Sequence, residues 1–346
     1  MTNIYNYNKQ QLQEVLVENG IPKFRTKQVW NWLYTNLAED FDQMTNLDGK
    51  TLSFLKNETE LPKMEVVKHQ KATDGTQKAL LRLSDGKLIE TVLMKYKHGY
   101  SVCVTTQIGC AVGCSFCASG LLGFTRNLQS GEIIAQVVYW QRVLGELNER
   151  VSNVVIMGIG EPFNNYKNTL AFMDCINDSD GLNIGARHIT VSTSGIVPKI
   201  YELANYGKQV NLAISLHAAD DETRSKIMKI NDVYPIADLM DAVDSYIETT
   251  NRRVSFEYIM LSDINDTASD AKKLASLVKG KNCHINLIPY NSVDENDYKA
   301  TPVATIERFV KVLTDNKIQV SVRRANGEDI DGACGQLRHK EKENNA

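Results

Sequence analysis

The sequence predicts an α/β protein whose parallel sheet forms a full or partial barrel, preceded by a small helical unit and β-hairpins. Strand-like runs alternate with amphipathic helical runs from about residue 101 onward, and 346 residues are enough for a barrel-sized domain with smaller additions. About seven strand-like runs, the first near 102–106, spread over about 230 residues and favour a barrel-like sheet. In such folds, functional residues lie at the carboxyl ends of the strands.

The first 60 residues contain three helical patterns. Apolar residues recur at three- and four-residue spacing in KQQLQEVLVENG, TKQVWNWLYTNL and DGKTLSFLKNE. From about 64 the period changes to β-type alternation, with turn signals at Asp74-Gly75 and Asp85-Gly86, so hairpins should precede the first barrel strand. We therefore expect a helical unit at 1–60, a hairpin extension at 61–100, a barrel at 101–337 and a polar, flexible tail at 338–346.

The barrel segment shows clear alternation. Its strand-like runs after the first are SNVVIMG, RHITVSTSG, VNLAISL, RRVSFEYIML, CHINLIPY and IQVSVR. Amphipathic runs such as GEIIAQVVYWQRVLGEL, ADLMDAVDSYIETT and ATIERFVKVLTDN separate them. The loops that follow the strands are therefore where chemistry is expected.

Composition and charge exclude several classes of protein. Hydrophobic residues make up 42% and charged residues 23%, which is typical of a folded globular protein. Neither a membrane span nor a secretory signal is recognisable, so we expect a cytoplasmic protein without membrane association. The net charge of −3 means that nucleic-acid binding would need a local basic patch. One candidate is 61–99, with eight Lys and Arg against four Asp and Glu, although such a run is also compatible with a solvated face.

Seven cysteines are present, four of them within fifteen residues. An odd number without an export signal does not indicate a disulfide framework. Cys110, Cys114 and Cys117 follow the first predicted barrel strand, among glycines that allow a tight loop. Three thiolates could belong to a zinc site with a fourth ligand, or could be buried reduced thiols. A 4Fe-4S cluster is favoured, because three cysteines leave one iron open to a small molecule.

The Cys-x3-Cys-x-aromatic-Cys spacing resembles the cluster motif of the radical S-adenosylmethionine (SAM) superfamily. The loop GIGEP after the strand VVIM is similar to the Gly-Glu-Pro loop of that superfamily. Most of the chain resembles the RlmN-type branch, the dual-specificity ribosomal and transfer RNA adenine carbon-2 methyltransferases, whose sister branch is the Cfr-type carbon-8 methyltransferases. Lys229 departs from the pattern, where proline is expected. The matching stretches are ETVLM, SVCVTTQ, the cysteine loop, GIGEPFNNY, ARHITVSTSG, ISLHA, RSKIM, INLIPYN and DIDGACGQL.

The resemblance implies a partial (β/α)6-type radical SAM barrel and two cofactors, a 4Fe-4S cluster and SAM, with two SAM molecules used per turnover. Cys110, Cys114 and Cys117 would ligate the cluster. Without the resemblance, His217 could be an ordinary half-buried histidine and Asn291 a turn residue. The implied SAM contacts are Gly160, Glu161, Ser192, Ser215, Leu216, His217 and Asn291.

The resemblance also implies three catalytic residues. Cys334 would carry the methyl group, Cys103 would resolve a protein–RNA adduct, and Glu90 would accept a proton. From the residues alone, Cys103 could be a small core thiol and Glu90 an ordinary strand-end carboxylate. The implied reaction is methylation of carbon 2 of an adenosine in the peptidyl transferase centre of 23S rRNA and of the adenosine 3′ of the anticodon in tRNA. It would proceed through a methylcysteine intermediate, and Cfr-type carbon-8 methylation is the alternative.

RNA binding must come from local patches. Lys23, Arg25 and Lys27 could contact phosphates, and the neighbouring aromatic residues Phe24, Trp30 and Trp32 could stack on a base, although the tryptophan spacing equally fits a helix core. We expect a monomer that receives electrons from a donor such as flavodoxin or ferredoxin. Two other classes remain: a radical SAM maturase or sulfur-inserting enzyme, which needs no Cys103–Cys334 pair, and a zinc-stabilised RNA-binding module, which would contain zinc in place of iron and sulfide.

Overall fold

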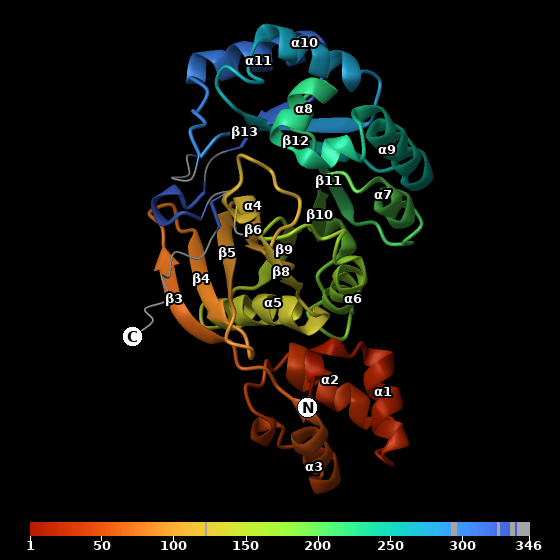
Figure 1. Ribbon diagram of the computed structural model, residues 1–346. Coiled ribbons are helices and arrows are strands. Elements are labelled where there is room, and N and C mark those ends of the chain that lie inside the picture. The colour runs from red at the N-terminus through yellow and green to blue at the C-terminus, as the bar shows by residue number, and fades with distance from the viewer. Residues whose placement is uncertain (122, 292–295, 324–325, 333–335, 338–346) are drawn as a thin grey trace.

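A ten-stranded sheet forms the centre of the molecule (Figure 1). The computed structural model describes the chain except for residues 122, 292–295, 324–325, 333–335 and 338–346. Neighbouring strands follow the order β14-β13-β12-β11-β10-β9-β6-β5-β4-β3, so in the described part of the chain the sheet remains open between β14 and β3. The predicted α/β fold with a partial barrel is confirmed.

The barrel wall is parallel, and an antiparallel extension continues it. The parallel strands are β6 (Gly99–Cys103), β9 (Val151–Ile156), β10 (Ile189–Thr193), β11 (Asn211–Ser215), β12 (Val254–Met260), β13 (Cys283–Pro289) and β14 (Val320–Val322). The extension consists of β3 (Glu65–Lys71), β4 (Gln77–Arg82) and β5 (Leu88–Tyr96). Gly75 and Gly86, in the two predicted turns, have φ values of +86° and +79°, which a residue with a side chain rarely adopts.

Helices connect the parallel strands, as alternating βα units require. They are α5 (Ser130–Gly145), α6 (Tyr166–Asn177), α7 (Val197–Ala204), α8 (Asp221–Ile227), α9 (Ile236–Thr250), α10 (Ala268–Leu277) and α11 (Val303–Asp315). Single 3₁₀ turns occupy Ile4–Asn6, Phe41–Gln43, Ala186–His188, Lys229–Asp232 and Glu328–Ile330. None of the helices that the structure describes has the length and apolar character needed to cross a membrane.

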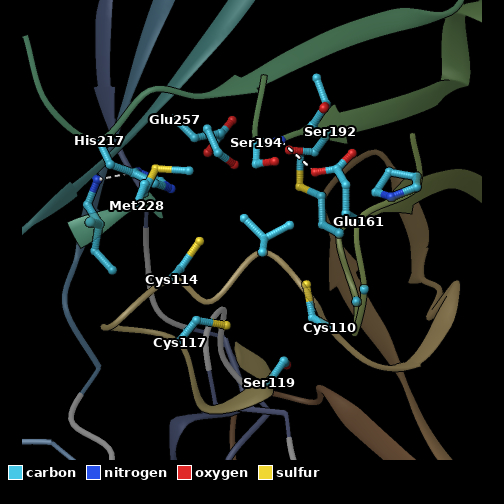
Figure 2. A pocket seen from close by; sticks show the side chains of 18 of the residues that line it. Cys110, Cys114, Cys117, Ser119, Glu161, Ser192, Ser194, His217, Met228 and Glu257 are labelled. Carbon is cyan, nitrogen blue, oxygen red and sulfur yellow. Dashed lines mark hydrogen bonds between the residues drawn. The ribbon is translucent and has the colours of Figure 1, made fainter. Parts of the chain in front are cut away.

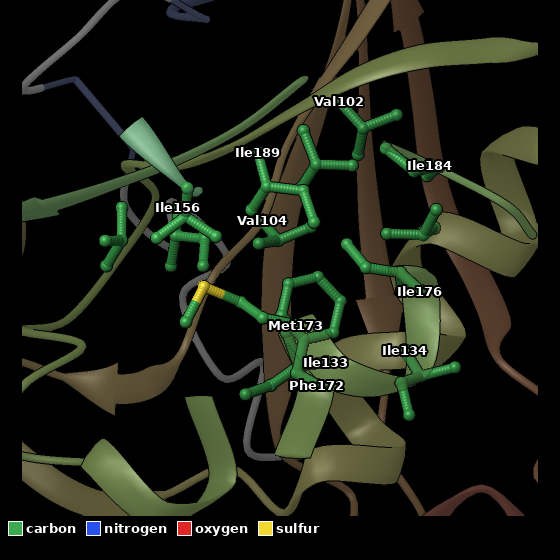
Figure 3. Close-up of a cluster of buried hydrophobic side chains, with 14 of the residues drawn as sticks. Val102, Val104, Ile133, Ile134, Ile156, Phe172, Met173, Ile176, Ile184 and Ile189 are labelled. Atoms are coloured by element: carbon green, nitrogen blue, oxygen red, sulfur yellow. The ribbon is translucent and has the colours of Figure 1, made fainter. Parts of the chain in front are cut away.

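The main core lies between the sheet and the helices that cover its outer face (Figure 3). Val102 and Val104, on and just after β6, meet Ile133 of α5 and Phe172 of α6 in this core. Because side chains alternate along a strand, Cys103, the residue between Val102 and Val104, points to the opposite face, inside the barrel.

The N-terminal helices α1 (Lys9–Glu18), α2 (Arg25–Tyr34) and α3 (Gly49–Glu58) form a separate layer below α5 (Figure 1). The unit closes on itself, because β1 (Thr2–Asn3) pairs in parallel with β2 (Thr59–Glu60). It contacts α5 near both ends. The Asn6 Oδ1 accepts the backbone N–H of Gly131 at 2.9 Å, and Arg142 Nη2 donates to the Ala38 carbonyl at 2.7 Å.

Candidate active site

A cavity of about 160 Å³ lies inside the barrel, beside the carboxyl ends of β9, β10 and β11 (Figure 2). Its wall brings together residues that are far apart in sequence, as expected if the loops after the strands carry the chemistry. The sequence-predicted residues that line it are Cys110, Cys114, Cys117, Gly160, Glu161, Ser192, Ser215 and His217. The structure therefore joins the predicted cluster ligands to most of the predicted SAM contacts.

The cysteine loop is enclosed by a short hairpin that the sequence did not reveal. Strand β7 (Gln107–Gly109) pairs with β8 (Phe124–Asn127), and the helix α4 (Ala118–Leu121) begins directly after Cys117. The Cys110 N–H donates to the Gly123 carbonyl at 2.9 Å. A Cβ on Gly109 would lie 1.7 Å from that carbonyl oxygen, so only glycine allows the two backbones to approach this closely.

Glu161 joins two loops at the cavity wall. Its Oε2 accepts the Ser194 N–H at 2.7 Å, and its Oε1 accepts the Phe163 N–H at 2.9 Å. Burial raises the pKa of this carboxyl, while the two backbone donors act in the opposite direction. The carboxylate oxygens retain further lone pairs for a cationic group in the cavity.

His217 is fixed as a neutral donor. Its Nδ1 accepts the Ile259 N–H at 3.1 Å, which places the ring proton on Nε2. Burial, assisted by Arg224, lowers the pKa of His217 to about 3, so the ring is uncharged at neutral pH. The ring meets Phe116 edge to face with centroids 4.9 Å apart, and its φ of +60° turns the chain sharply after β11.

Two charged residues of the cavity wall were not predicted from the sequence. Glu257, on β12, is buried and accepts the Asn286 Nδ2 at 2.8 Å; burial raises the pKa of its carboxyl, and Arg323 opposes that rise. Arg323 lines the same wall just after β14. The sequence does contain a feature that could have identified Glu257: it is the only charged residue in the mostly apolar strand VSFEYIM, and a buried charge of this kind often has a functional role.

Not every predicted SAM contact lies at the cavity wall. Among the described residues, Leu216 belongs to the hydrophobic core and Asn291 follows β13, and neither lines the cavity. The Leu216 backbone is also engaged, because its N–H donates to the Glu257 carbonyl and its carbonyl accepts from Arg224 Nε. Lys229, the departure from the family pattern, is exposed and adjacent to Met228, which does line the cavity.

The predicted catalytic residues Glu90 and Cys103 share the inner face of the sheet. Val92 is the register partner of Cys103, and Glu90 lies two residues before Val92 on the same face of β5. Both Glu90 and Cys103 are buried. Cys103 packs in a small cluster with Leu337, against Met157, and Met157 also lines the cavity. Cys334 lies outside the described residues.

Thr105 connects this inner face to the cavity. Its Oγ1 donates to the Glu90 carbonyl at 2.6 Å and accepts the Ile159 N–H at 3.1 Å. Ile159 belongs to the loop that contains Gly160 and Glu161. The Thr105 hydroxyl group therefore links the Glu90 backbone to the loop that forms part of the cavity wall.

Comparison with known proteins places this arrangement in a family. Residues 2–61 match the model described as "Ribosomal RNA large subunit methyltransferase N-terminal domain" (RlmN_N), and residues 104–277 match the "Radical SAM superfamily" model. The "Probable dual-specificity RNA methyltransferase RlmN" of Bacillus velezensis is 52% identical over 340 residues, covering 98% of this chain and 94% of the relative. The protein of the same name from Staphylococcus carnosus is 51% identical over 340 residues, covering 98% and 93%. The chain belongs to the RlmN family of radical SAM methyltransferases.

A solved structure agrees with this family. A radical SAM methyltransferase from Sphaerobacter thermophilus is 43% identical and superimposes with a TM-score of 0.95, covering 98% of this chain and 99% of the other. The match at the N-terminal domain supports the RlmN branch over the Cfr branch. Membership of the RlmN family means that the chain is a SAM-dependent enzyme that uses a 4Fe-4S cluster.

The three thiols of the cysteine loop lie at one cavity and have the donor chemistry for the cluster of the RlmN family. Burial raises the pKa of Cys110 to about 11 and that of Cys114 well above its usual range, so these thiols need a cationic partner to ionise. No three His, Cys, Asp or Glu side chains in the described part of the chain are placed to bind one metal ion together. Thiolates on a multi-iron cluster bind different iron atoms, so they stand farther apart than the ligands of a single ion.

Proposed function

We propose that this chain methylates carbon 2 of an adenosine in 23S rRNA, at the peptidyl transferase centre, and of the adenosine 3′ of the anticodon in tRNA. The names of the curated relatives support a dual-specificity RNA methyltransferase. The structural observation that carries the proposal is the set of contacts made by Asp331 and Leu337, which lie before and after residues 333–335. On one side, the Asp331 carbonyl accepts from Lys78 Nζ at 3.1 Å, and Lys78 pairs with Glu90. On the other side, Leu337 packs in the cluster that contains Cys103.

A second contact draws this segment toward the cysteine loop. Ser119 lies two residues after Cys117 and donates its hydroxyl hydrogen to the Leu337 carbonyl at 3.0 Å. The residues flanking Cys334 thus contact the surroundings of Glu90, of Cys103 and of the cavity. This supports the assignment of all three residues to one reaction.

We assign cluster binding to Cys110, Cys114 and Cys117. When bound, the cluster supplies the electron for reductive cleavage of SAM. The SAM contacts are assigned to Glu161 and the Gly160 backbone for the ammonium group, and to Ser192, Ser215, His217 and Asn291 for the other polar groups. Leu216 contributes by fixing the backbone between Ser215 and His217.

The reaction needs a methyl carrier because carbon 2 of adenine is not a nucleophile. The Cys334 thiolate accepts the methyl group of one SAM molecule, and a second SAM molecule is consumed to activate that methyl group for attack on the adenine. The resulting adduct holds one unpaired electron. Glu90 takes the proton from carbon 2, and that electron would return to the oxidised cluster, which leaves a closed-shell adduct. The Cys103 thiolate then attacks the Cys334 sulfur, so that an S–S bond forms, the C–S bond breaks, and its electron pair passes to the carbon, which takes up a proton. A thiol reductant returns the disulfide to two thiols.

RNA binding is assigned in part to the N-terminal helices. Phe24 is exposed and can stack on a base, whereas Trp30 is buried in the core, as its helical spacing allowed. Arg25 Nη2 pairs with Asp48 at 2.7 Å and is largely covered. Lys27, which is 76% exposed and has a long 3.8 Å contact with Asp180, and the exposed Lys23 are therefore the more available cations of this patch. We further propose that the enzyme works as a cytoplasmic monomer with an electron donor such as flavodoxin or ferredoxin, because reductive SAM cleavage requires a low-potential donor.

The deciding experiment compares RNA from cells with and without this chain. Mass analysis of nucleosides from purified 23S rRNA and tRNA should show 2-methyladenosine only when the chain is present. Methylation at carbon 8 would identify the Cfr-type reaction. If neither 2-methyladenosine nor 8-methyladenosine differs between cells with and without the chain, in either RNA, the proposed substrates are rejected.

A further inference from the structure

A buried ion pair lies on the inner face of the hairpin extension. Lys78 Nζ of β4 is 3.0 Å from Glu90 Oε1 of β5, and the two side chains are only 7% and 5% exposed. The register explains the contact: Lys78 is the partner of Val92, and Glu90 lies two residues away on the same face, within diagonal reach of a long side chain. In the sequence, Lys78 is one of the basic residues of 61–99, a segment that could be either a nucleic-acid-binding patch or a solvated face.

Such a pair is costly to bury. The desolvation of two charges commonly cancels their attraction, and apolar residues of similar size are often as stable at such a position. The pair therefore adds little to folding stability by itself. Its clear effect is on one partner, because the nearby ammonium group favours the ionised form of a carboxyl group that burial would otherwise protonate.

Lys78 makes a second contact that the pair alone does not explain. The same Nζ donates to the Asp331 carbonyl at 3.1 Å, and Asp331 is three residues before Cys334. The neighbouring turn is held as well, because the Thr73 N–H donates to Asp329 Oδ2 and the Gly327 N–H donates to Asp74 Oδ2. The β3–β4 hairpin thus holds the segment that leads to Cys334.

We propose that Lys78 is a positioning residue for the reaction: it holds Glu90 as the carboxylate that can accept the carbon-2 proton, and its contact with the Asp331 carbonyl fixes its ammonium group beside that carboxylate. The inference rests on the proposed role of Glu90. The proton moves from carbon 2 to a Glu90 oxygen, and Lys78 remains an ammonium group throughout. Among the described residues, the titratable groups near Glu90 on the inner face of the sheet are Lys78 of β4, in direct contact, and Cys103 of β6, whose register partner is Val92.

The test measures separate steps with Lys78→Met, which keeps the length of the side chain and removes its charge. Purified, cluster-loaded enzyme is incubated with SAM, a reductant and a substrate RNA over a range of pH. Peptide mass analysis gives the methylation of Cys334, and denaturing gels give the protein–RNA adduct and its rate of release. We expect normal Cys334 methylation, release slowed about tenfold or more at neutral pH, and recovery at alkaline pH, because a buried carboxylate without its cation holds a proton more tightly.

Three variants are compared with it. Lys78→Arg keeps the charge and should release RNA at neutral pH. Glu90→Gln should stall at every pH, by ~100-fold or more, because the proton acceptor itself is absent. Lys281→Met removes a lysine from another ion pair, with Asp244 at 2.6 Å between α9 and the start of β13, and should behave as the wild type.

The outcomes separate the two proposals. If Glu90→Gln stalls but Lys78→Met releases RNA normally, the role of Lys78 is wrong and that of Glu90 stands. If Glu90→Gln releases RNA normally, the role of Glu90 is wrong and the inference about Lys78 falls with it. If Lys78→Met lowers Cys334 methylation and release equally at all pH values, Lys78 is only structural.

A double variant covers the case in which Lys78→Met does not fold. Lys78→Met combined with Glu90→Gln leaves no unpaired buried charge, so it should fold. If Lys78 acts through Glu90, the double variant releases RNA no more slowly than Glu90→Gln alone. Further slowing would show that Lys78 acts independently and would overturn the inference.

Discussion

Glu161 and Ser194 are joined across the cavity wall, because the Glu161 Oε2 accepts the Ser194 N–H at 2.7 Å and so ties the loop after β9 to the loop after β10. We propose that the same carboxylate supplies the negative charge for the ammonium group of a bound SAM. Glu161 would then shape the cavity and also contribute to its affinity.

Replacing Glu161 should separate these two roles. Glu161→Gln keeps one acceptor oxygen but loses the charge, so SAM should bind at least about tenfold more weakly, equivalent to ~1.4 kcal/mol. Glu161→Ala should also lower the melting temperature, since two buried N–H groups lose their acceptor at a cost of roughly 1–3 kcal/mol each. Calorimetric titration with SAM gives the affinity, with Glu202→Gln on the surface of α7 as the control. An unchanged affinity in Glu161→Gln would show that SAM does not use this carboxylate.

Cluster binding should depend on three cysteines and not on a fourth. Alanine at Cys110, Cys114 or Cys117 should remove most of the iron and abolish SAM cleavage, because two thiolates cannot hold the cluster. Cys283→Ala is the matched control: this cysteine is buried at the start of β13 and should keep full iron content. Iron and sulfide analysis of anaerobically prepared protein decides the matter, and full iron in all three variants would reject the ligand assignment.

Cys334 and Cys103 should fail at different steps. Cys334→Ala should bind SAM and the cluster but transfer no methyl group to RNA. Cys103→Ala should methylate Cys334 and attack the adenine, then stall as a protein–RNA adduct, since the thiolate that breaks the C–S bond is missing. Denaturing gels after incubation with RNA should show a slowly migrating species only for Cys103→Ala. If both variants turn over normally and lose only about 1 kcal/mol of stability, the two thiols are structural.

The low pKa of His217 predicts a pH-dependent stability. His217 has a pKa of about 3 in the folded protein and about 6.5 when unfolded, so between these values the unfolded chain binds the extra proton. Stability from this residue is complete above the unfolded pKa and falls by up to ~1.4 kcal/mol per pH unit as the pH drops from there toward 3. His217→Gln should flatten that dependence, measured as the difference in melting temperature between pH 7.5 and about 5.5. Equal slopes in both proteins would contradict the buried neutral ring.

The N-terminal patch should affect RNA and leave SAM chemistry intact. Lys23→Glu with Lys27→Glu should weaken RNA affinity and make its salt dependence shallower by about one unit of slope per lost phosphate contact. The control is the double variant Lys272→Glu and Lys279→Glu, which makes the same change in net charge. These two lysines lie in and just after α10, far from the N-terminal helices (Figure 1). RNA affinity that falls equally in both double variants would indicate a general charge effect.

Local patterns predicted most of the strands and helices but missed contacts between distant segments. The runs RHITVST and VNLAIS correctly located β10 and β11. In β10 buried and half-buried residues alternate as the sequence does, and β11 has three consecutive buried residues that give a strong apolar signal. The β7–β8 hairpin was missed, since its two short strands flank a fourteen-residue cysteine loop and their pairing depends on Gly109 meeting Gly123. A contact between residues this far apart in the chain produces no periodic pattern in the sequence.

The candidate site likewise contains some residues that the sequence predicts and others that it does not. The spacing of Cys110, Cys114 and Cys117 was sufficient to predict a shared centre, and the structure places all three at one cavity. Lys78 could not be assigned from the sequence, because a lysine in a basic segment usually faces solvent and only the register of β4 with β5 turns it toward Glu90. Leu216 shows the converse, since its neighbours line the cavity while its own side chain points into the core.

Asn6 contacts Gly131 near the start of α5 and Ala38 contacts Arg142 near its end, so the N-terminal unit is attached to this helix at two separated points. A chain shortened to begin at residue 61 would lose both attachments and uncover the side of α6 where Cys175 donates to the Tyr34 hydroxyl. The buried side chains of the N-terminal helices and of the barrel also belong to one continuous hydrophobic core. We propose that an RNA bound by those helices would meet the cavity at a set distance, so the position of an adenosine in a folded RNA would contribute to its selection together with the base itself.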